Sequence, residues 1–289
     1  MGYGDHLMAI GAASRQHLED PQRRLVAIGD GCRVESDYSD LEHGLSFLAN
    51  QRTVDAGAPV TWIISYKAFR PYHDHAAMEA QWSLAHPARR RLFGRPDPRT
   101  LVDRLGYYVF NPQYRAEPAP LVLTSEEAGL ADKLGQKPFV LIEPHIKSTA
   151  SPSKRWPFER FAAVAETLSR EIEIYQVGSP ELPALAKARR ITTHSFREAL
   201  PYLKSARLYL GPEGGLHHAA AAMGTPAVVL FGGYVPPSVT GYAMHTNLTG
   251  GATACGSQHR ICRHCEAAMA NIQPDHVLLA VREILQRPD

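Results

Sequence analysis

The stretch LGPEGGLHHAAAAMGTP, residues 210–226, predicts the turn from a strand into a helix, and it decides the fold class. The apolar run at 206–210 that leads into it is typical of a buried strand. The alanine-rich run after the glycines suits a helix, and a second apolar run follows at 227–233. Strand, helix and strand in this order indicate a parallel sheet covered by helices.

The glycines of this turn allow two interpretations. Gly214 and Gly215 have no Cβ, so a ligand can approach the backbone closely. The helix that follows directs its free N–H groups and the positive end of its dipole at the turn, which is a site for an anion such as a diphosphate. Alternatively, the glycines only allow the chain to turn from strand to helix. The turn by itself does not decide between these interpretations.

Composition sets limits on what the protein is. The chain has 289 residues, of which 44% are hydrophobic and 21% charged, as expected for one large or two medium globular domains. A net charge of +2 does not favour a nucleic acid as partner. Four cysteines in a chain of this length do not make a disulfide scaffold. Neither a long apolar run nor a signal peptide is recognisable, so a cytoplasmic protein is expected.

The N-terminus carries the sequence GYGD at residues 2–5, which predicts a glycine loop entering a helix with Leu7, Ile10 and Leu18 on one face. Asp5 could cap that helix, or it could serve as a general base at a cleft. Such a loop normally follows a buried strand, and here Met1 directly precedes it. We therefore expect either a trimmed chain or another segment in place of that strand.

The rest of the N-terminal third has a weaker pattern, with strands expected at 24–30, 59–66 and 107–110. Residues 66–75 mix aromatic, basic and titratable side chains, which could line a polar pocket or form a solvated loop. The arginines at 89–91, with Arg95 and Arg99, could be a solvated face or could contact an anionic acceptor or lipid headgroup.

A proline-rich segment at 112–120 is the best candidate for a linker, and strands and helices alternate after it. This predicts an α/β protein with domains at 1–120 and 121–289, facing each other across a cleft at the carboxyl ends of their strands. Ser195 and Glu198 form the capping-box pattern of a short helix. The other expected elements are helices at 125–133, 156–170, 180–190 and 274–285, and strands at 139–143 and 172–178.

Several ordered blocks resemble glycosyltransferase family 9, whose best-known members are the ADP-heptose:lipopolysaccharide heptosyltransferases. Besides the glycine-Asp loop at 2–5, they are SKRWPFERF at 153–161, GSPE at 178–181, EGGLHHAAA at 213–221 and IQPDHV at 272–277. The resemblance is strong from about residue 138 to about residue 285 and weak from 12 to 120.

The resemblance implies the glycosyltransferase B fold, made of two Rossmann-like domains, and an inverting enzyme that needs no catalytic metal. It implies a nucleotide diphosphate sugar as donor, with ADP-heptose as the first choice. The acceptor would be a glycan or lipid-linked glycoconjugate of the cell envelope, so peripheral contact with the inner membrane is also expected.

The resemblance also assigns roles to single residues. Asp5 corresponds to the general base for the acceptor hydroxyl, and Lys154 to the cation at the donor diphosphate. Lys154 could instead be a surface residue at a helix start, although helix dipoles disfavour a cation there. Glu181 corresponds to a residue at the nucleoside, and His218 to the family histidine. The expected donor site comprises Ser151, Lys154, Glu181, Ser195, Glu213, Gly214, Gly215 and His218.

The chain departs from the family pattern within this site. The family usually has Asp at the position of Glu213, and Ser or Thr at the position of Gly214. Glutamate is longer by one methylene, which moves the carboxylate by about 1.5 Å. The identity of the nucleotide or of the sugar could therefore differ.

Cysteines near the C-terminus could hold a structural zinc or iron ion. Cys262 and Cys265 have the spacing of a metal knuckle, and Cys255 or His259 could complete a tetrahedral site, with His264 nearby. Alternatively, these residues are reduced, unliganded thiols.

Two other functions remain open from the sequence. A nucleotide-sugar epimerase or hydrolase would need an acid–base pair, which Glu213 with His217 or His218 could supply. A nucleotide-sugar-binding protein without activity is the other alternative.

Overall fold

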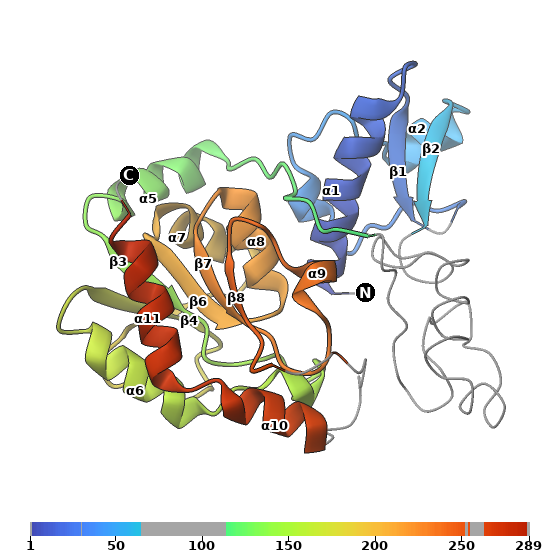
Figure 1. Ribbon diagram of the computed structural model, residues 1–289. Helices are drawn as coiled ribbons and strands as arrows, with labels where there is room; N and C mark the ends of the chain where they lie inside the picture. The colour runs from blue at the N-terminus through green and yellow to red at the C-terminus, as the bar shows by residue number, and fades with distance from the viewer. Residues whose placement is uncertain (1, 30, 65–113, 252–253, 255–262, 288–289) are drawn as a thin grey trace, which may run out of the picture. The chain divides into compact units, whose positions relative to one another are not determined.

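The computed structural model describes residues 2–29, 31–64, 114–251, 254 and 263–287 (Figure 1). The chain divides into two compact units, one of residues 1–122 with 238–240, the other of residues 123–237 with 241–289. The polar segment at 66–75, the arginine cluster at 89–99 and the expected strand at 107–110 lie outside the described residues.

The second unit contains a six-stranded sheet in which every pair of neighbouring strands is parallel. The strand order is β5-β4-β3-β6-β7-β8. This is the order of a doubly wound dinucleotide-binding fold, in which the chain starts at the centre and adds strands first on one side and then on the other. The strands are β3 (Phe139–Ile142), β4 (Glu173–Gly178), β5 (Arg189–Thr192), β6 (Leu208–Pro212), β7 (Ala227–Leu230) and β8 (Thr246–Leu248).

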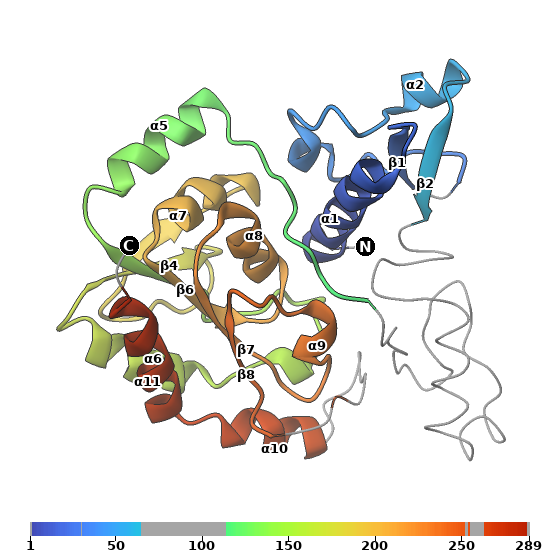
Figure 2. The same ribbon diagram turned by 45° about the horizontal axis from the view of Figure 1, so that its top comes forward.

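Helices cover both faces of this sheet (Figure 2). Residues of α6 (Phe158–Leu168) and α11 (Pro274–Leu285) pack with Val140, Leu210 and Val228 in one buried cluster. On the other side lie α7 (Leu200–Ser205) and α8 (Gly215–Met223), with α5 (Ser125–Leu134) against α7. Two-sided coverage explains why the central strands β3, β6 and β7 are buried along their whole length rather than on alternate residues. The remaining elements of this unit are η2 (Pro152–Lys154), η3 (Arg197–Ala199) and α10 (Arg263–Asn271), whereas α9 (Pro237–Thr240) falls mostly in the first unit.

The helix expected at 125–133 is α5, and its cap is the residue before it. Thr124, not Ser125, accepts a hydrogen bond from the Glu127 N–H at 3.2 Å, and the Glu127 carboxylate accepts one from the Thr124 N–H at 2.7 Å. This reciprocal pair satisfies two N–H groups that a helix leaves open at its start.

The predicted helix at 180–190 is wrong. The segment forms a turn and then the edge strand β5. Its backbone is held by Gln176 on β4, whose amide donates to the Pro183 carbonyl at 2.9 Å and accepts from the Leu185 N–H at 2.6 Å. Pro183 has no N–H of its own, so a helix through it would lose a hydrogen bond.

The first unit contains a two-stranded parallel sheet of β1 (Leu25–Gly29) and β2 (Val60–Ile64), close to the expected strands. Helix α1 (Tyr3–Glu19) packs on β1 and buries Leu7 and Ile10, whereas Leu18 is exposed, contrary to expectation. Two short helical segments follow β1, namely η1 (Ser39–Glu42) and α2 (Gln51–Asp55).

None of the helices in the described ranges is long and apolar enough to cross a membrane.

Candidate active site

The carboxyl ends of β3 and β6 mark the site in the second unit. These strands are neighbours, and the chain reverses its direction of strand addition between them. Open parallel sheets bind ligands at such a switch point, because the loops after the two strands diverge there. Glu213 directly follows β6, and Lys154 ends η2 in the segment between β3 and α6. The candidate site is therefore built around these two residues.

Lys154 and Glu213 form an ion pair through Nζ and Oε2. The Glu213 side chain is 6% exposed and that of Lys154 is 17% exposed, so the pair is shielded from water. Lys154 Nζ also lies 4.9 Å from the centre of the Tyr234 ring, in the loop after β7. The cation is thus held over an aromatic face as well as by a carboxylate, which strengthens its placement at a desolvated position.

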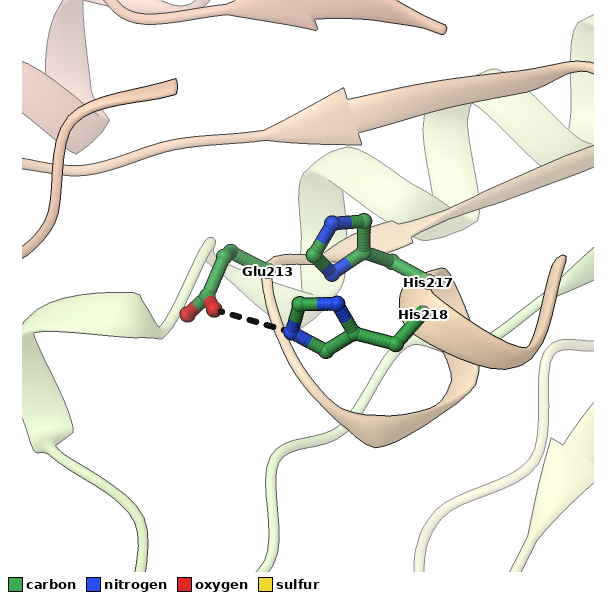
Figure 3. A group of neighbouring side chains, drawn as sticks. All are labelled: Glu213, His217 and His218. Atoms are coloured by element: carbon green, nitrogen blue, oxygen red, sulfur yellow. Dashed lines mark ion pairs between the residues drawn. The ribbon is translucent and has the colours of Figure 1, made fainter. Parts of the chain in front are cut away.

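Histidines from the first turn of α8 complete the cluster. Figure 3 shows His217 and His218 side by side, with His218 directed at Glu213. His218 Nε2 lies 3.7 Å from Glu213 Oε1, and His218 Nδ1 lies 2.8 Å from the Tyr242 hydroxyl. An imidazole with its proton on Nε2 satisfies both contacts, donating towards Glu213 and accepting from Tyr242. Tyr242 therefore fixes the orientation of His218.

The cluster has well-defined charges. Burial alone would raise the pKa of Glu213, but the charge of Lys154, the His218 hydrogen bond and nearby His217 outweigh it and hold this pKa well below its usual value. Burial and then the neighbouring His218 lower the pKa of His217, and burial lowers the pKa of His245 to about 4. At neutral pH the site combines one carboxylate, one ammonium group and neutral His217 and His245.

The start of α8 leaves room beside this cluster. Gly214 has an extended backbone (φ 173°), and its N–H donates to His217 Nδ1 at 3.2 Å. The closest atom to a Cβ built on Gly214 would be the Pro212 carbonyl oxygen at 3.9 Å. Local packing and strain do not require glycine here, so the missing side chain leaves space in front of the helix N-terminus. The geometry fits an anion bound by Lys154 and the α8 amides.

The loop that carries Lys154 is anchored in the core. Trp156 is 1% exposed and donates from Nε1 to the Ile272 carbonyl at 2.9 Å. Arg160 donates to the same carbonyl at 2.7 Å and to that of Ala270 at 2.8 Å. A Cβ on Gly232 would lie 2.4 Å from the Ser153 carbonyl oxygen, so the loop after β7 packs directly against η2.

The other expected donor-site residues also follow strand ends. Ser151 is buried and its hydroxyl accepts from the Ser153 N–H at 3.3 Å, at the start of η2. Glu181 is exposed in the turn after β4. Ser195 is exposed after β5 and donates to the Glu198 carboxylate at 3.2 Å. Lys154 and His218 therefore both contact Glu213. Glu181 lies in an exposed turn, and Ser195 contacts Glu198 instead.

Asp5 lies in the first unit, in the first turn of α1. Its carboxylate accepts from the Gly2 N–H at 3.1 Å, as in a helix cap. The helix begins at Tyr3, so Asp5 lies within the helix rather than in a loop before it.

The cysteine cluster is described only in part. Cys255, His259 and Cys262 lie outside the described residues. Cys265 is buried, and a Cβ on Gly233 would lie 3.1 Å from its Sγ and 2.9 Å from His264 Nδ1. Two candidate ligands of the predicted metal site therefore approach the same point of the loop after β7.

A second group of residues has metal-binding chemistry. One ligand atom from each of Glu213, His217 and His218 lies within 4.8 Å of the others. The Lys154 ammonium group already balances the Glu213 charge, which favours an anion-binding role for this cluster over a cation site.

Sequence reasoning missed Tyr234, Tyr242 and Glu143. Glu143 and Tyr234 each lie in the segment that follows a strand, β3 and β7 respectively. That position at a strand end could have indicated that they belong to the site. Tyr242 follows Gly241 outside every motif noted in the sequence, and its contact with His218 could not be predicted from spacing.

We expect Tyr242→Phe to cost about 1 kcal/mol of unfolding free energy, because the buried His218 Nδ1 loses its partner. Urea denaturation would measure the loss, and the imidazole nitrogen shifts in NMR spectra would report a change of His218 tautomer. Unchanged nitrogen shifts would contradict the orienting role of Tyr242. Tyr202→Phe is a suitable control, since that ring packs against Tyr175.

The chain is similar to known proteins in sequence family and in fold. The model of "Glycosyltransferase family 9 (heptosyltransferase)" matches residues 105–273. The Escherichia coli ADP-heptose lps heptosyltransferase II structure has a TM-score of 0.59 at 15% identity, over 98% of this chain and 96% of that chain. Among curated proteins, none matches this sequence.

Three further structures are similar to this chain. TibC, a dodecameric iron-containing glycosyltransferase from enterotoxigenic E. coli H10407, has a TM-score of 0.59 at 16% identity, over 99% of this chain and 76% of that chain. A TibC complex with ADP-D-β-D-heptose has a TM-score of 0.52. The family 9 glycosyl transferase from Veillonella parvula matches in part, over 59% of this chain and 55% of that chain, with 16% identity and a TM-score of 0.45. The likenesses to heptosyltransferase II and TibC confirm the predicted α/β glycosyltransferase B fold class.

Proposed function

Because the chain belongs to glycosyltransferase family 9, we propose that it transfers a sugar, with inversion, from a nucleotide diphosphate sugar to a hydroxyl group of an acceptor. The observation that carries this proposal is the shielded Lys154–Glu213 pair beside the open N-terminus of α8.

The site contains the groups that this transfer reaction needs. When the glycosidic bond to the nucleotide breaks, negative charge builds on the leaving diphosphate. Lys154 would move from Glu213 to a phosphate oxygen, while the first amides of α8 bind the neighbouring oxygens. Glu213 and Tyr234 hold the lysine in place before the donor arrives, so little reorganisation is needed when it binds. In this proposal the leaving-group charge is stabilised without a catalytic metal ion.

Asp5 is our candidate for the general base that takes the proton of the acceptor hydroxyl. A carboxylate suits this role because it accepts a proton as the hydroxyl attacks the sugar. The resemblance of residues 2–5 to the family loop supports the assignment, and the cap to Gly2 would hold the carboxylate in a fixed orientation.

The donor is proposed to be an ADP-sugar, with ADP-heptose the first choice, since TibC was solved with ADP-D-β-D-heptose. A lipopolysaccharide-type envelope glycan is proposed as acceptor, because the similar E. coli structure is described as an ADP-heptose lps heptosyltransferase. An enzyme of this kind would work in the cytoplasm, in peripheral contact with the inner membrane.

A structural metal is a separate proposal. Cys265 and His264, together with Cys255 and Cys262, would hold zinc or iron by thiolate and imidazole ligation. TibC is described as iron-containing, which makes iron the first ion to test.

Isothermal titration with ADP, GDP, UDP and one sugar derivative of each would test the transferase proposal. Binding of one nucleotide series, with movement of the sugar to an acceptor, is the expected result. A donor whose sugar is altered or released without an acceptor would favour the epimerase or hydrolase. Binding without any turnover would favour the inactive binder, and no binding would exclude all three.

The general base has its own test. Asp5→Asn should lower the transfer rate by about 10²–10⁴-fold, because the amide cannot take the proton. The amide oxygen can still accept from the Gly2 N–H, so the fold and the donor affinity should be unchanged. Steady-state transfer assays with donor titrations on the same preparation would separate the two effects. Asp20→Asn, at the end of the same helix, is the matched control, and a fully active Asp5→Asn would refute the assignment.

A further inference from the structure

Glu143 is a carboxyl group at the candidate site that the proposed reaction does not use. It directly follows β3, and its backbone N–H donates to the Leu210 carbonyl of β6 at 2.9 Å. The register pairs Ile142 with Leu210, so Glu143 lies opposite Gly211 at the switch point of the sheet. Its Oε2 accepts a hydrogen bond from the hydroxyl of the fully buried Tyr209.

A glycine makes this contact available. Tyr209 and Gly211 are two residues apart on β6, so they point to the same face of the sheet. A Cβ on Gly211 would lie 2.2 Å from the Tyr209 hydroxyl oxygen and 3.2 Å from Glu143 Cβ. Only a residue without a side chain lets the tyrosine ring cross this position and reach the neighbouring strand.

The pair lies within the electrostatic reach of the donor site. Lys154 from η2 and Tyr209 from β6 are the groups that act on Glu143, and Glu213 in turn acts on Tyr209. Burial raises the pKa of Glu143 to about 7, although the Tyr209 hydrogen bond and the charge of Lys154 both lower it. Near neutral pH the site therefore holds one ammonium group, one ionised carboxylate and a second carboxyl group that can be neutral.

Resting on the proposed function, we propose that Glu143 is a donor-binding residue that acts as a neutral acid: it donates its proton in a hydrogen bond to the donor diphosphate, so that donor and one proton bind together.

The reason is charge balance. With Glu143 ionised, a diphosphate would meet two carboxylates and a single lysine, and like charges at close range oppose binding. With Glu143 protonated, Oε2 still accepts the Tyr209 hydroxyl and the carboxyl proton can face an anionic oxygen. A carboxylic acid kept neutral by an apolar site is an effective hydrogen-bond donor to developing or full negative charge.

The test measures donor affinity against pH by isothermal titration in two buffers of different ionisation enthalpy. The probe is whichever of ADP-glucose, GDP-mannose and UDP-glucose binds tightest, since both phosphates of these diesters stay ionised throughout. A folded-state pKa near 7 means that the neutral form is lost as the pH rises through 7. Affinity should therefore be level below pH 7 and fall about tenfold per pH unit above it, with uptake of one proton.

Two variants make the test specific. Glu143→Gln is permanently neutral and keeps a donor, so its affinity should match that of the wild type at pH 6 and lose its pH dependence and proton uptake. Tyr209→Phe removes a hydrogen bond that lowers the pKa of Glu143, so the fall in affinity should move to higher pH. If the donor affinity of Glu143→Gln falls with rising pH as steeply as that of the wild type, the inference is overturned. Loss of donor binding by Glu143→Gln at every pH would overturn it as well. If the wild type binds neither these probes nor ADP-heptose at any pH, the proposed function itself fails.

Discussion

Lys154→Ala is expected to weaken donor binding about 10–100-fold, because a charge-assisted hydrogen bond to a phosphate contributes roughly 1.5–3 kcal/mol. Removing the ammonium group also leaves the shielded Glu213 carboxylate facing the diphosphate, which adds repulsion. Isothermal titration of the nucleotide sugar would measure the change. A loss smaller than about threefold would show that Lys154 does not contact the donor.

The controls separate this effect from damage to the fold. Arg155→Ala removes an exposed cation from the next position and should leave affinity unchanged. The double variant Lys154→Met with Glu213→Gln replaces the ion pair by a neutral pair, so no buried charge is left without a partner. It should fold normally and still bind the donor weakly. Wild-type affinity in the double variant would contradict the assigned role of Lys154.

Trp156→Ala is expected to lower the unfolding free energy by about 3–5 kcal/mol. The indole is 1% exposed, packs edge-on against Phe161 with 4.7 Å between ring centres, and holds the Ile272 carbonyl. Its loss leaves a cavity beneath η2 and breaks the bond to the segment between α10 and α11. Guanidinium denaturation followed by far-UV circular dichroism would measure the change.

Two further variants show how much of that loss of unfolding free energy is specific to the buried indole. Leu279→Ala on the exposed side of α11 should change stability by less than about 0.5 kcal/mol. Trp156→Phe keeps most of the ring volume but loses the N–H, so its loss of unfolding free energy should lie between those of Trp156→Ala and Leu279→Ala. If Trp156→Ala costs no more than Leu279→Ala, the indole does not anchor the loop that carries Lys154.

The second unit could be predicted from sequence because its signals are local. Continuous apolar runs mark the buried parallel strands, and the glycines before α8 mark the turn where Lys154 and Glu213 meet. The predicted helix at 180–190 is wrong because Gln176, a side chain of the preceding strand, satisfies the backbone there. No periodicity within the segment could reveal a partner on another strand.

The interior of the site could be predicted less well. The pairing of Tyr209 with Glu143 depends on the register between β3 and β6, which sets which residue faces the bare Gly211. The orientation of His218 depends on Tyr242, which follows another strand and a short helix. These are tertiary contacts, and a single sequence does not show which of its residues come into contact in the folded chain.

The bond from Gln176 to the segment around Pro183 has a consequence for how this protein could diversify. The Gln176 amide on a rigid strand, together with His145 at the Pro183 carbonyl, fixes the far end of the turn that carries Glu181, while the near end leaves β4 at Gly178. Arg190 donates to the Ser179 and Leu182 carbonyls within the turn. Residues between these two fixed points can be lengthened, shortened or exchanged while the sheet keeps its hydrogen bonds. In the proposed donor site, where the family resemblance places Glu181 at the nucleoside, loop grafting at this one turn would change nucleoside preference and leave the proposed phosphate site around Lys154 intact.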